Sequence, residues 1–477
     1  MGKYYRLPAR FIIIAAFLLI NLSGCQKDEP EEKAGNVINL NNPTHWHIAS
    51  TPQHQTIPGM FPEGSLHNDL GFRYNSARLA WYIIDRLFTD TQANTPSHIA
   101  NDPDQRSMHY VRQVLNTEIW PDETNPRPIP VMNMAFYPNE RGPYNFDVAG
   151  SPYSSGINMD GTLKDPHTRW GGIMRPMLFT NLAEANVTHI EFWVLDPFIY
   201  QPAHEGGDMY INLGHISEDV LRDGEKAFEN GLPVTAQVIN VDTTIWGRVP
   251  TIQPIVHAFA NSAMARKFQD VGLNGLSTED ERTFYAEPFL DKIIALFGEN
   301  SQAYQLAWKD PAADDYHYFL GSQLDQVQAS ILDRYKRYNG LEGNSPTSDM
   351  SPEPYPTHST LLPNSEDINM DGILNETERY FQYTISLRPG DMTKGNNFIT
   401  DIREATVQLA NGQTETVRWY QFQIPLDHPT RQTIGNISSF NDIPFMRIFF
   451  KGFSELVVCR FATLELARSS NKPLQPM

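Results

Sequence analysis

The chain has 477 residues, of which 40% are hydrophobic, and 56 Asp and Glu outweigh 37 Lys and Arg to give a formal net charge of −19. This acidic balance repels nucleic acid and anionic lipid headgroups, so it argues against a nucleic-acid-binding protein. The length allows two or three ordinary domains, or one large domain with an insertion. No apolar run after the first 25 residues is long enough for a membrane-spanning helix.

The N-terminus has the pattern of a secretory signal that ends in a lipoprotein cleavage site. Cationic residues precede an apolar stretch over 11–22, which is too short to cross a bilayer as a helix. A pair of small residues directly before Cys25 is the pattern that lipoprotein signal peptidase cleaves. We therefore expect residues 1–24 to be a signal peptide and Cys25 to carry acyl chains that anchor the protein. The alternative is an ordinary secretory signal with an incidental cysteine.

The residues after Cys25 predict an acylated, flexible tether and lead-in over 25–63. Residues 26–32 are charged and contain proline, so they cannot bury enough apolar surface to fold. Residues 25–29 resemble the acidic export signal that carries lipoproteins to the cell surface in bacteria with type IX secretion. A tether on the periplasmic face is the alternative. His45, His47 and His54 fall in the lead-in and are interpreted as solvated histidines.

Strand patterns follow in two groups. The first group lies at 131–137, 171–178, 187–195 and 208–213, and the second at 380–387, 404–410, 416–424, 445–450 and 456–467. The apolar run at 79–85 fits a buried strand and a short helix equally well.

Helical patterns separate the two groups of strands. They lie at 217–224, 259–270, 278–297 and 322–338. Strands, helices and strands again predict a mainly β protein, a jelly-roll-type antiparallel β-sandwich interrupted by a helical segment. The expected division places the first part of the sandwich at 64–214, a helical and loop insertion at 215–365, the remaining strands at 366–470 and a tail at 471–477.

Residues 367–378 have the spacing of a twelve-residue calcium loop. Oxygen-bearing side chains stand at the ligand positions, Gly372 marks the sharp turn, and a glutamate ends the loop. The predicted ligands are Asp367, Asn369, Asp371, the Ile373 carbonyl, Asn375 and Glu378. The sequence therefore predicts a structural Ca²⁺ site, and the alternative is an Asx-rich turn without an ion.

Other motifs do not indicate catalytic chemistry. Residues 270–281 share the outline of a calcium loop, but Gly272 stands where a ligand is needed, and Ser277 or Thr278 as the cap of the next helix explains the pattern. No nucleophile elbow, phosphate-binding glycine loop or zinc-protease helix occurs in the sequence. We therefore expect a protein that is not an enzyme.

Ordered blocks of sequence over residues 65–468 resemble a known family. They include WGGIMR at 170–175, IEFW at 190–193, WGRVPT at 246–251, FQDVGL at 268–273, DPAADD at 310–315, YNGLEGNSP at 338–346 and RFATLEL at 460–466. This series resembles the SprA family, also called Sov, the outer-membrane translocon of type IX protein secretion. The similarity covers an internal, non-barrel region of that much longer protein.

The resemblance implies a soluble module that is an accessory or split component of type IX protein transport, associated with gliding motility. With the lipoprotein signal and the lack of catalytic motifs, we expect a non-enzymatic outer-membrane lipoprotein. Its expected partners are the outer membrane, through the lipid anchor, and translocon components or secreted cargo. The alternative is a surface lipoprotein that binds glycan or protein in a calcium-dependent manner. A third alternative is a hydrolase whose catalytic carboxylates come from separate parts of the sandwich.

Overall fold

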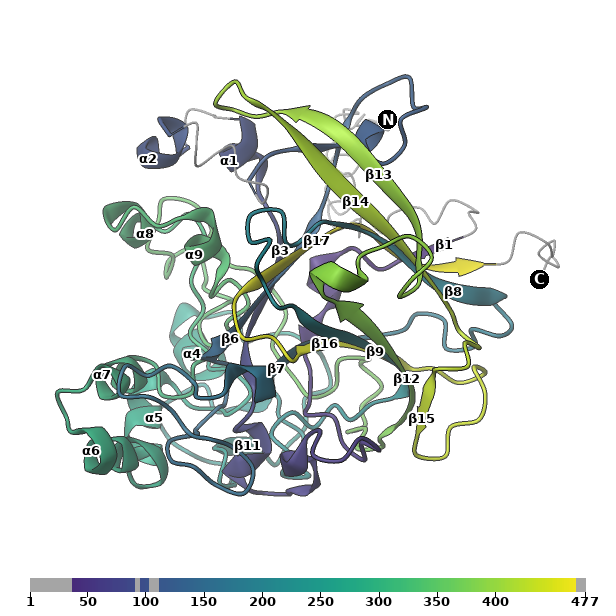
Figure 1. Ribbon diagram of the computed structural model, residues 1–477. Coiled ribbons are helices and arrows are strands. Elements are labelled where there is room, and N and C mark those ends of the chain that lie inside the picture. The colour runs from purple at the N-terminus through teal and green to yellow at the C-terminus, as the bar shows by residue number, and fades with distance from the viewer. Residues whose placement is uncertain (1–36, 91–94, 103–110, 469–477) are drawn as a thin grey trace, which may run out of the picture.

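Two antiparallel sheets lie face to face and enclose the main apolar core (Figure 1). The computed structural model describes residues 37–90, 95–102 and 111–468. The strands of the first sheet, in spatial order, are β13 (Ile399–Gln408), β14 (Thr414–Pro425), β8 (Val187–Leu195), β17 (Val457–Arg468), β6 (Met132–Arg141) and β3 (Ala77–Ile83). Those of the second are β15 (Gln432–Ile434), β12 (Arg379–Leu387), β9 (Gly207–His215), β16 (Phe445–Lys451), β7 (Trp170–Pro176) and β2 (His47–Ile48).

Aromatic side chains join the two sheets. Phe136 of β6 stacks on Phe450 of β16 with ring centroids 6.0 Å apart, and both side chains are fully buried. Burying a side chain of this size stabilises the fold by about 1.5–3 kcal/mol. The prediction of a mainly β protein with antiparallel sheets packed as a sandwich is confirmed.

Residues 37–48 belong to the sandwich in the structure. Strand β1 (Val37–Asn39) pairs with residues 465–467 of β17, whereas β6 pairs with residues 457–461 of the same strand. Strand β2 pairs with β7 at the edge of the second sheet. The first part of the predicted lead-in is therefore held by both sheets.

The helical segment lies beside the sheets (Figure 1). Its helices are α4 (Ala263–Gln269), α5 (Thr278–Phe284), the π-helical turn Ala286–Leu290, α6 (Asp291–Phe297), α7 (Gln302–Lys309), α8 (Ser322–Gln326) and α9 (Ile331–Tyr335). The remaining short elements are α1 (Arg86–Asp90), α2 (Ser97–Ala100), and the paired strands β4 (Val114–Leu115) with β5 (Pro128–Ile129) and β10 (Val241–Thr243) with β11 (Arg248–Pro250). The expected helical segment between the two groups of strands is thus present, whereas the exact division of the chain into domains remains a prediction.

Strand β3 shows why its sequence fits a strand and a helix equally. Leu79 and Trp81 face the core between the sheets, whereas Ala80 and Tyr82 pack on the opposite face. The ring of Tyr82 stacks on Tyr335 of α9 with centroids 4.2 Å apart. Because both faces are buried, the alternation that marks a half-buried strand is missing.

Two predicted helices are interrupted, and the one expected over 259–270 is shortened to α4. The helix expected over 278–297 is divided by the π-helical turn around Pro288, whose ring nitrogen cannot donate a helical hydrogen bond. The helix expected over 322–338 is divided into α8 and α9, and Gln328 between them has a left-handed backbone with φ 52°. Helix α7 was not predicted.

The turn of helix predicted at 217–224 is wrong, because this segment is not helical. The Asp219 carboxylate accepts hydrogen bonds from the backbone N–H of Asp223 at 3.2 Å and of Gly224 at 3.0 Å. Arg222 between them has φ 53°. A side-chain acceptor that captures nearby N–H groups competes with the helical pattern and stabilises a turn.

Candidate functional site

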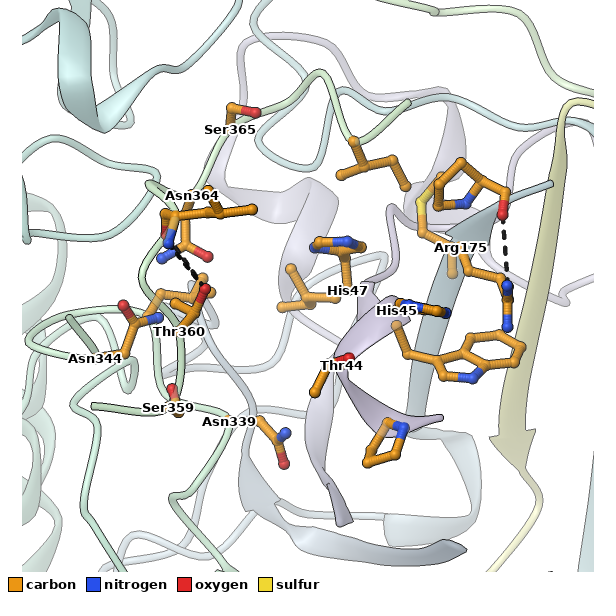
Figure 2. Close-up of a pocket in the computed structure, with 18 of the residues that line it drawn as sticks. Thr44, His45, His47, Arg175, Asn339, Asn344, Ser359, Thr360, Asn364 and Ser365 are labelled. Atoms are coloured by element: carbon orange, nitrogen blue, oxygen red, sulfur yellow. Dashed lines mark hydrogen bonds between the residues drawn. The ribbon is translucent and has the colours of Figure 1, made fainter. Parts of the chain in front are cut away.

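A cleft of about 500 Å³ lies between the edge of the second sheet and the loops that follow α9 (Figure 2). One wall is formed by residues 43–48 and by β7. The opposite wall is formed by residues 338–344 and 359–370. Segments that are far apart in the sequence therefore meet only after the sandwich has formed.

In the first wall, Trp46 is anchored by a hydrogen bond and packs against Arg175. The buried indole of Trp46 donates from Nε1 to the Leu40 carbonyl at 2.9 Å, and Arg175 lies over its ring at 5.6 Å. Burial lowers the pKa of Arg175 to about 10, so the guanidinium stays charged at neutral pH. Among the described residues no carboxylate pairs with Arg175, and its Nη1 has no hydrogen-bond partner. The wall thus has a buried positive charge with a free donor.

Two histidines next to Arg175 are neutral near pH 7. Burial, with smaller contributions from His45 and Arg175, lowers the pKa of His47 to about 4. Burial and Arg175 also lower the pKa of His45. Both line the cleft, but His45, like His54, is exposed and His47 is partly buried, so the interpretation as solvated histidines holds for His45 and His54 and not for His47. Figure 2 shows both rings on the wall that carries Arg175.

The second wall is rich in amides and hydroxyls. Asn339 ties this wall to β3, since its side chain accepts from the Trp81 N–H at 2.8 Å and donates to the Trp81 carbonyl at 3.0 Å. These two bonds satisfy backbone groups at the edge of the first sheet. Further polar side chains on this wall, visible in Figure 2, are Asn344, Ser359, Thr360, Asn364 and Ser365.

Exposed apolar side chains border the cleft. Leu178 is 77% exposed, Met370 54% and Leu362 48%. Large apolar side chains that are grouped at the rim of a cleft with polar side chains on one wall are typical of a surface that a partner covers. The arrangement can bind a chain that offers both backbone hydrogen-bonding groups and apolar side chains.

The predicted calcium loop lies beside the cleft and forms the sharp turn that its glycine indicates. Gly372 has φ 85°, and the Asp367 carboxylate accepts from the N–H groups of Asp371 and Gly372, each at 3.0 Å. Asn369 donates to Asp371 at 2.9 Å, and the side chain of Ile373 is exposed. These contacts are those of an Asx-rich turn.

A lysine lies against this turn. The buried ammonium of Lys226 is 3.6 Å from Oδ2 of Asp367 and donates to the Gly372 carbonyl. It therefore places a positive charge next to the first predicted calcium ligand.

The last predicted ligands face away from the turn. Glu378 forms a fully buried, two-point ion pair with Arg447, with N–O distances of 2.9 and 3.0 Å. Asn375 donates to Glu218 at 2.6 Å. As arranged, the six predicted ligands do not form one oxygen cage. Calcium binding here stays a prediction, and it would require Lys226 and Glu378 to leave their partners.

Comparison with known families identifies part of the chain. Residues 288–475 match the SprA_N family, described as motility related/secretion protein. This region is related to SprA. It begins in the π-helical turn before α6 and includes α6 to α9 and β12 to β17, hence the amide-rich wall of the cleft. The wall with Arg175 precedes the SprA-related region. No curated protein matches the chain.

The predicted lipid attachment site, Cys25, lies outside the described residues. Within the part of the chain that the structure describes, no helix has both the length and the apolar character needed to cross a bilayer.

Proposed function

We propose that this protein is a non-enzymatic lipoprotein of the outer membrane that acts as an accessory or split component of type IX secretion. The match of residues 288–475 to a motility and secretion family is the observation that carries the proposal. A net charge of −19 suits a body that is held at a membrane surface by lipid and does not bind the headgroups through its own charge.

The cleft is the proposed docking site for an extended segment of another secretion component or of secreted cargo. An extended chain carries free backbone N–H and C=O groups, and the amides and hydroxyls of 339–365 provide partners for them. The apolar rim would cover apolar side chains of the segment. Arg175 would donate to a carbonyl or a carboxylate, which satisfies its free Nη1.

A photo-crosslinking amino acid at Leu362, on the rim of the cleft, tests this docking in the native bacterium. We expect crosslinks to a type IX component or to secreted cargo, identified by mass spectrometry. The control position is Val327, which is 73% exposed and does not line the cleft. The same products from both positions, or no product from Leu362, would contradict the proposal.

The lipid anchor has its own test, because the chain has only two cysteines. Cys459 is fully buried, and burial raises the pKa of its thiol to about 12, so it should react with a thiol reagent only after unfolding. If the sulfur of Cys25 carries lipid, the unfolded mature protein has one reactive thiol, that of Cys459. A second reactive thiol would exclude lipid attachment through sulfur.

A further inference from the structure

A cluster of carboxylates lies inside the helical segment, away from the predicted calcium loop. Carboxylate oxygens of Glu281, Asp310 and Asp314 lie within 4.8 Å of one another, and so do those of Asp314, Asp315 and Glu342. Asp314 belongs to both groups and is fully buried, as is Glu281. These residues come from α5, from the loop after α7 and from the loop after α9.

Two of the five carboxylates have clear protein partners. Asp310 pairs with Arg337 and also accepts from the Asp314 N–H at 3.0 Å. Asp315 accepts from the Thr278 hydroxyl at 3.1 Å. The structure thus accounts for Asp310 without a further ligand, whereas Asp315 accepts on one oxygen only.

Glu281 has a donor on each carboxylate oxygen, whereas Glu342 is only partly satisfied. Glu281 accepts from the Asn274 amide and, at 3.1 Å, from the Ala312 N–H. One oxygen of Glu342 accepts from the Thr278 N–H at 2.8 Å, and the other is buried without a hydrogen-bond partner. No cation pairs with either carboxylate among the salt bridges of the described residues.

Asp314 has no donor on either oxygen among the described residues, although it is fully buried. The Tyr144 hydroxyl lies against Asp314, whose charge and hydrogen-bonding contact add to the effect of burial in raising the pKa of Tyr144, but this contact lacks the geometry of a full hydrogen bond. Arg78 and Arg141 donate to the carbonyls of Ala313 and Pro311. A buried carboxylate without a partner is strongly destabilising.

The surroundings of Asp314 leave room for its carboxylate. Gly272 has φ 75°, and a Cβ there would lie 2.6 Å from Oδ2 of Asp314. Any side chain at this position would therefore displace the carboxylate from the cluster. The free oxygens of Asp314 and Glu342, with a carboxylate oxygen of Asp315 beside them, form a compact set of hard ligands.

We propose that Asp314, Glu342 and Asp315 bind a calcium ion that is a permanent part of the folded protein. Calcium accepts six to eight oxygen ligands in flexible geometry, whereas magnesium keeps several waters and rarely occupies an all-protein cage. A divalent ion supplies the charge that the arginines of this region do not provide to Asp314. It links the loop after α7 to the loop after α9, both of which Thr278 joins to α5, so its removal loosens the helical segment.

The first measurement is the calcium content and melting temperature of the full-length protein in detergent. We expect one bound calcium per chain by mass spectrometry, and a lower melting temperature after dialysis against EDTA that added CaCl₂ restores. A wild-type protein that binds no calcium would overturn the proposal.

Asp314→Asn is the decisive variant, because it removes the charge and keeps the shape of the side chain. We expect it to lose the bound calcium, with affinity reduced by more than about tenfold. In EDTA at pH 8 it should be at least as stable as wild type, since the uncompensated buried charge is gone. A variant that keeps its calcium, or that is destabilised equally with and without calcium, contradicts the site.

Matched variants distinguish this site from the loop at 367–378. Glu279→Gln removes an exposed carboxylate from the same helix α5 and should change neither calcium content nor stability. Loss of calcium from Asp371→Asn instead of Asp314→Asn would place the ion in the loop and reject the proposal. If Asp314→Asn does not fold, Glu342→Gln, which is partly exposed, is measured in the same way.

Discussion

At the scale of single residues, Glu378 shows what spacing predicts and what it does not. The sequence places a carboxylate at the last position of a calcium loop, but it gives no information about Arg447, which lies 69 residues further along the chain. In the structure the Arg447 guanidinium donates hydrogen bonds to both carboxylate oxygens of Glu378. Burial lowers the pKa of Arg447, and Glu378 and Tyr380 more than offset this effect, so its pKa is raised.

Glu378→Gln should therefore destabilise the protein by about 3 kcal/mol, because it leaves a buried guanidinium without its counter-charge. The loss should be the same in CaCl₂ and in EDTA, as measured by urea unfolding of variant and wild type. Glu376→Gln, an exposed change in the same loop, is the control and should have an effect within about 0.5 kcal/mol. A loss seen only in CaCl₂ would show that Glu378 is a calcium ligand.

The environment of Glu465 predicts that the free energy of unfolding depends on pH. It lies opposite Glu191 on the neighbouring strand, and Gln421 and Gln423 donate to Glu191 at 2.7 and 3.0 Å. Burial, with a contribution from Glu191, raises the pKa of Glu465 to about 7. Between the ordinary pKa of about 4.3 and pH 7 the folded protein holds a proton that the unfolded chain has released. Stability therefore falls as the pH rises through this window.

Glu465→Gln should remove this loss and stabilise the protein at pH 8 by about 1–2 kcal/mol, a value reduced for partial exposure of the side chain. At pH 4 the variant and the wild type should be similar. Urea unfolding at several pH values checks this, with exposed Glu455→Gln as the control. Parallel pH profiles for Glu465→Gln and wild type would contradict the assignment.

At the scale of elements, the sequence predicts best where one face of a strand carries polar residues, as β8 does with His189 and Glu191. Strand β8 occupies the same residues, 187–195, as the alternating pattern. Strand β3 is buried on both faces, so its pattern does not distinguish a strand from a helix. Hydrophobic periodicity does not report local effects on helices. The Asp219 carboxylate binds backbone N–H groups and replaces the predicted helical turn, and the ring of Pro288 interrupts the helix predicted over 278–297.

Residues 37–48 are an element of the sandwich, and Leu40 tests this placement. Its side chain is fully buried, and its N–H donates to the Leu464 carbonyl at 2.8 Å. Leu40→Ala should cost about 2–5 kcal/mol of unfolding free energy. Val37→Ala, at a side chain that is 39% exposed, should stay within about 0.5 kcal/mol. An effect equally small for both would show that this segment is not packed in solution.

At the scale of the whole molecule, composition and the two groups of strands predict the sandwich and its helical segment. The cleft could not be predicted, because its walls join residues near 45, 175, 340 and 360 that only the fold brings together. The same holds for the acidic cluster. Glu281 ends the segment 270–281, whose pattern a helix cap at Ser277 or Thr278 explains, and Asp314 approaches it only through tertiary packing. Ser277, predicted as a cap of that helix, does accept from the Asp280 N–H at 3.3 Å.

The central claim is that this protein takes part in protein secretion through its cleft, and a secretion assay in the native bacterium tests it most directly. Deletion strains are complemented with wild type, with Leu178→Asp at the rim, or with Val327→Asp, an equally exposed apolar position outside the cleft. Both substitutions should leave the free energy of unfolding nearly unchanged. We predict that type IX cargo in the medium is lost in the deletion strain, restored by wild type and Val327→Asp, and not restored by Leu178→Asp. Normal cargo secretion in the deletion strain would contradict the claim.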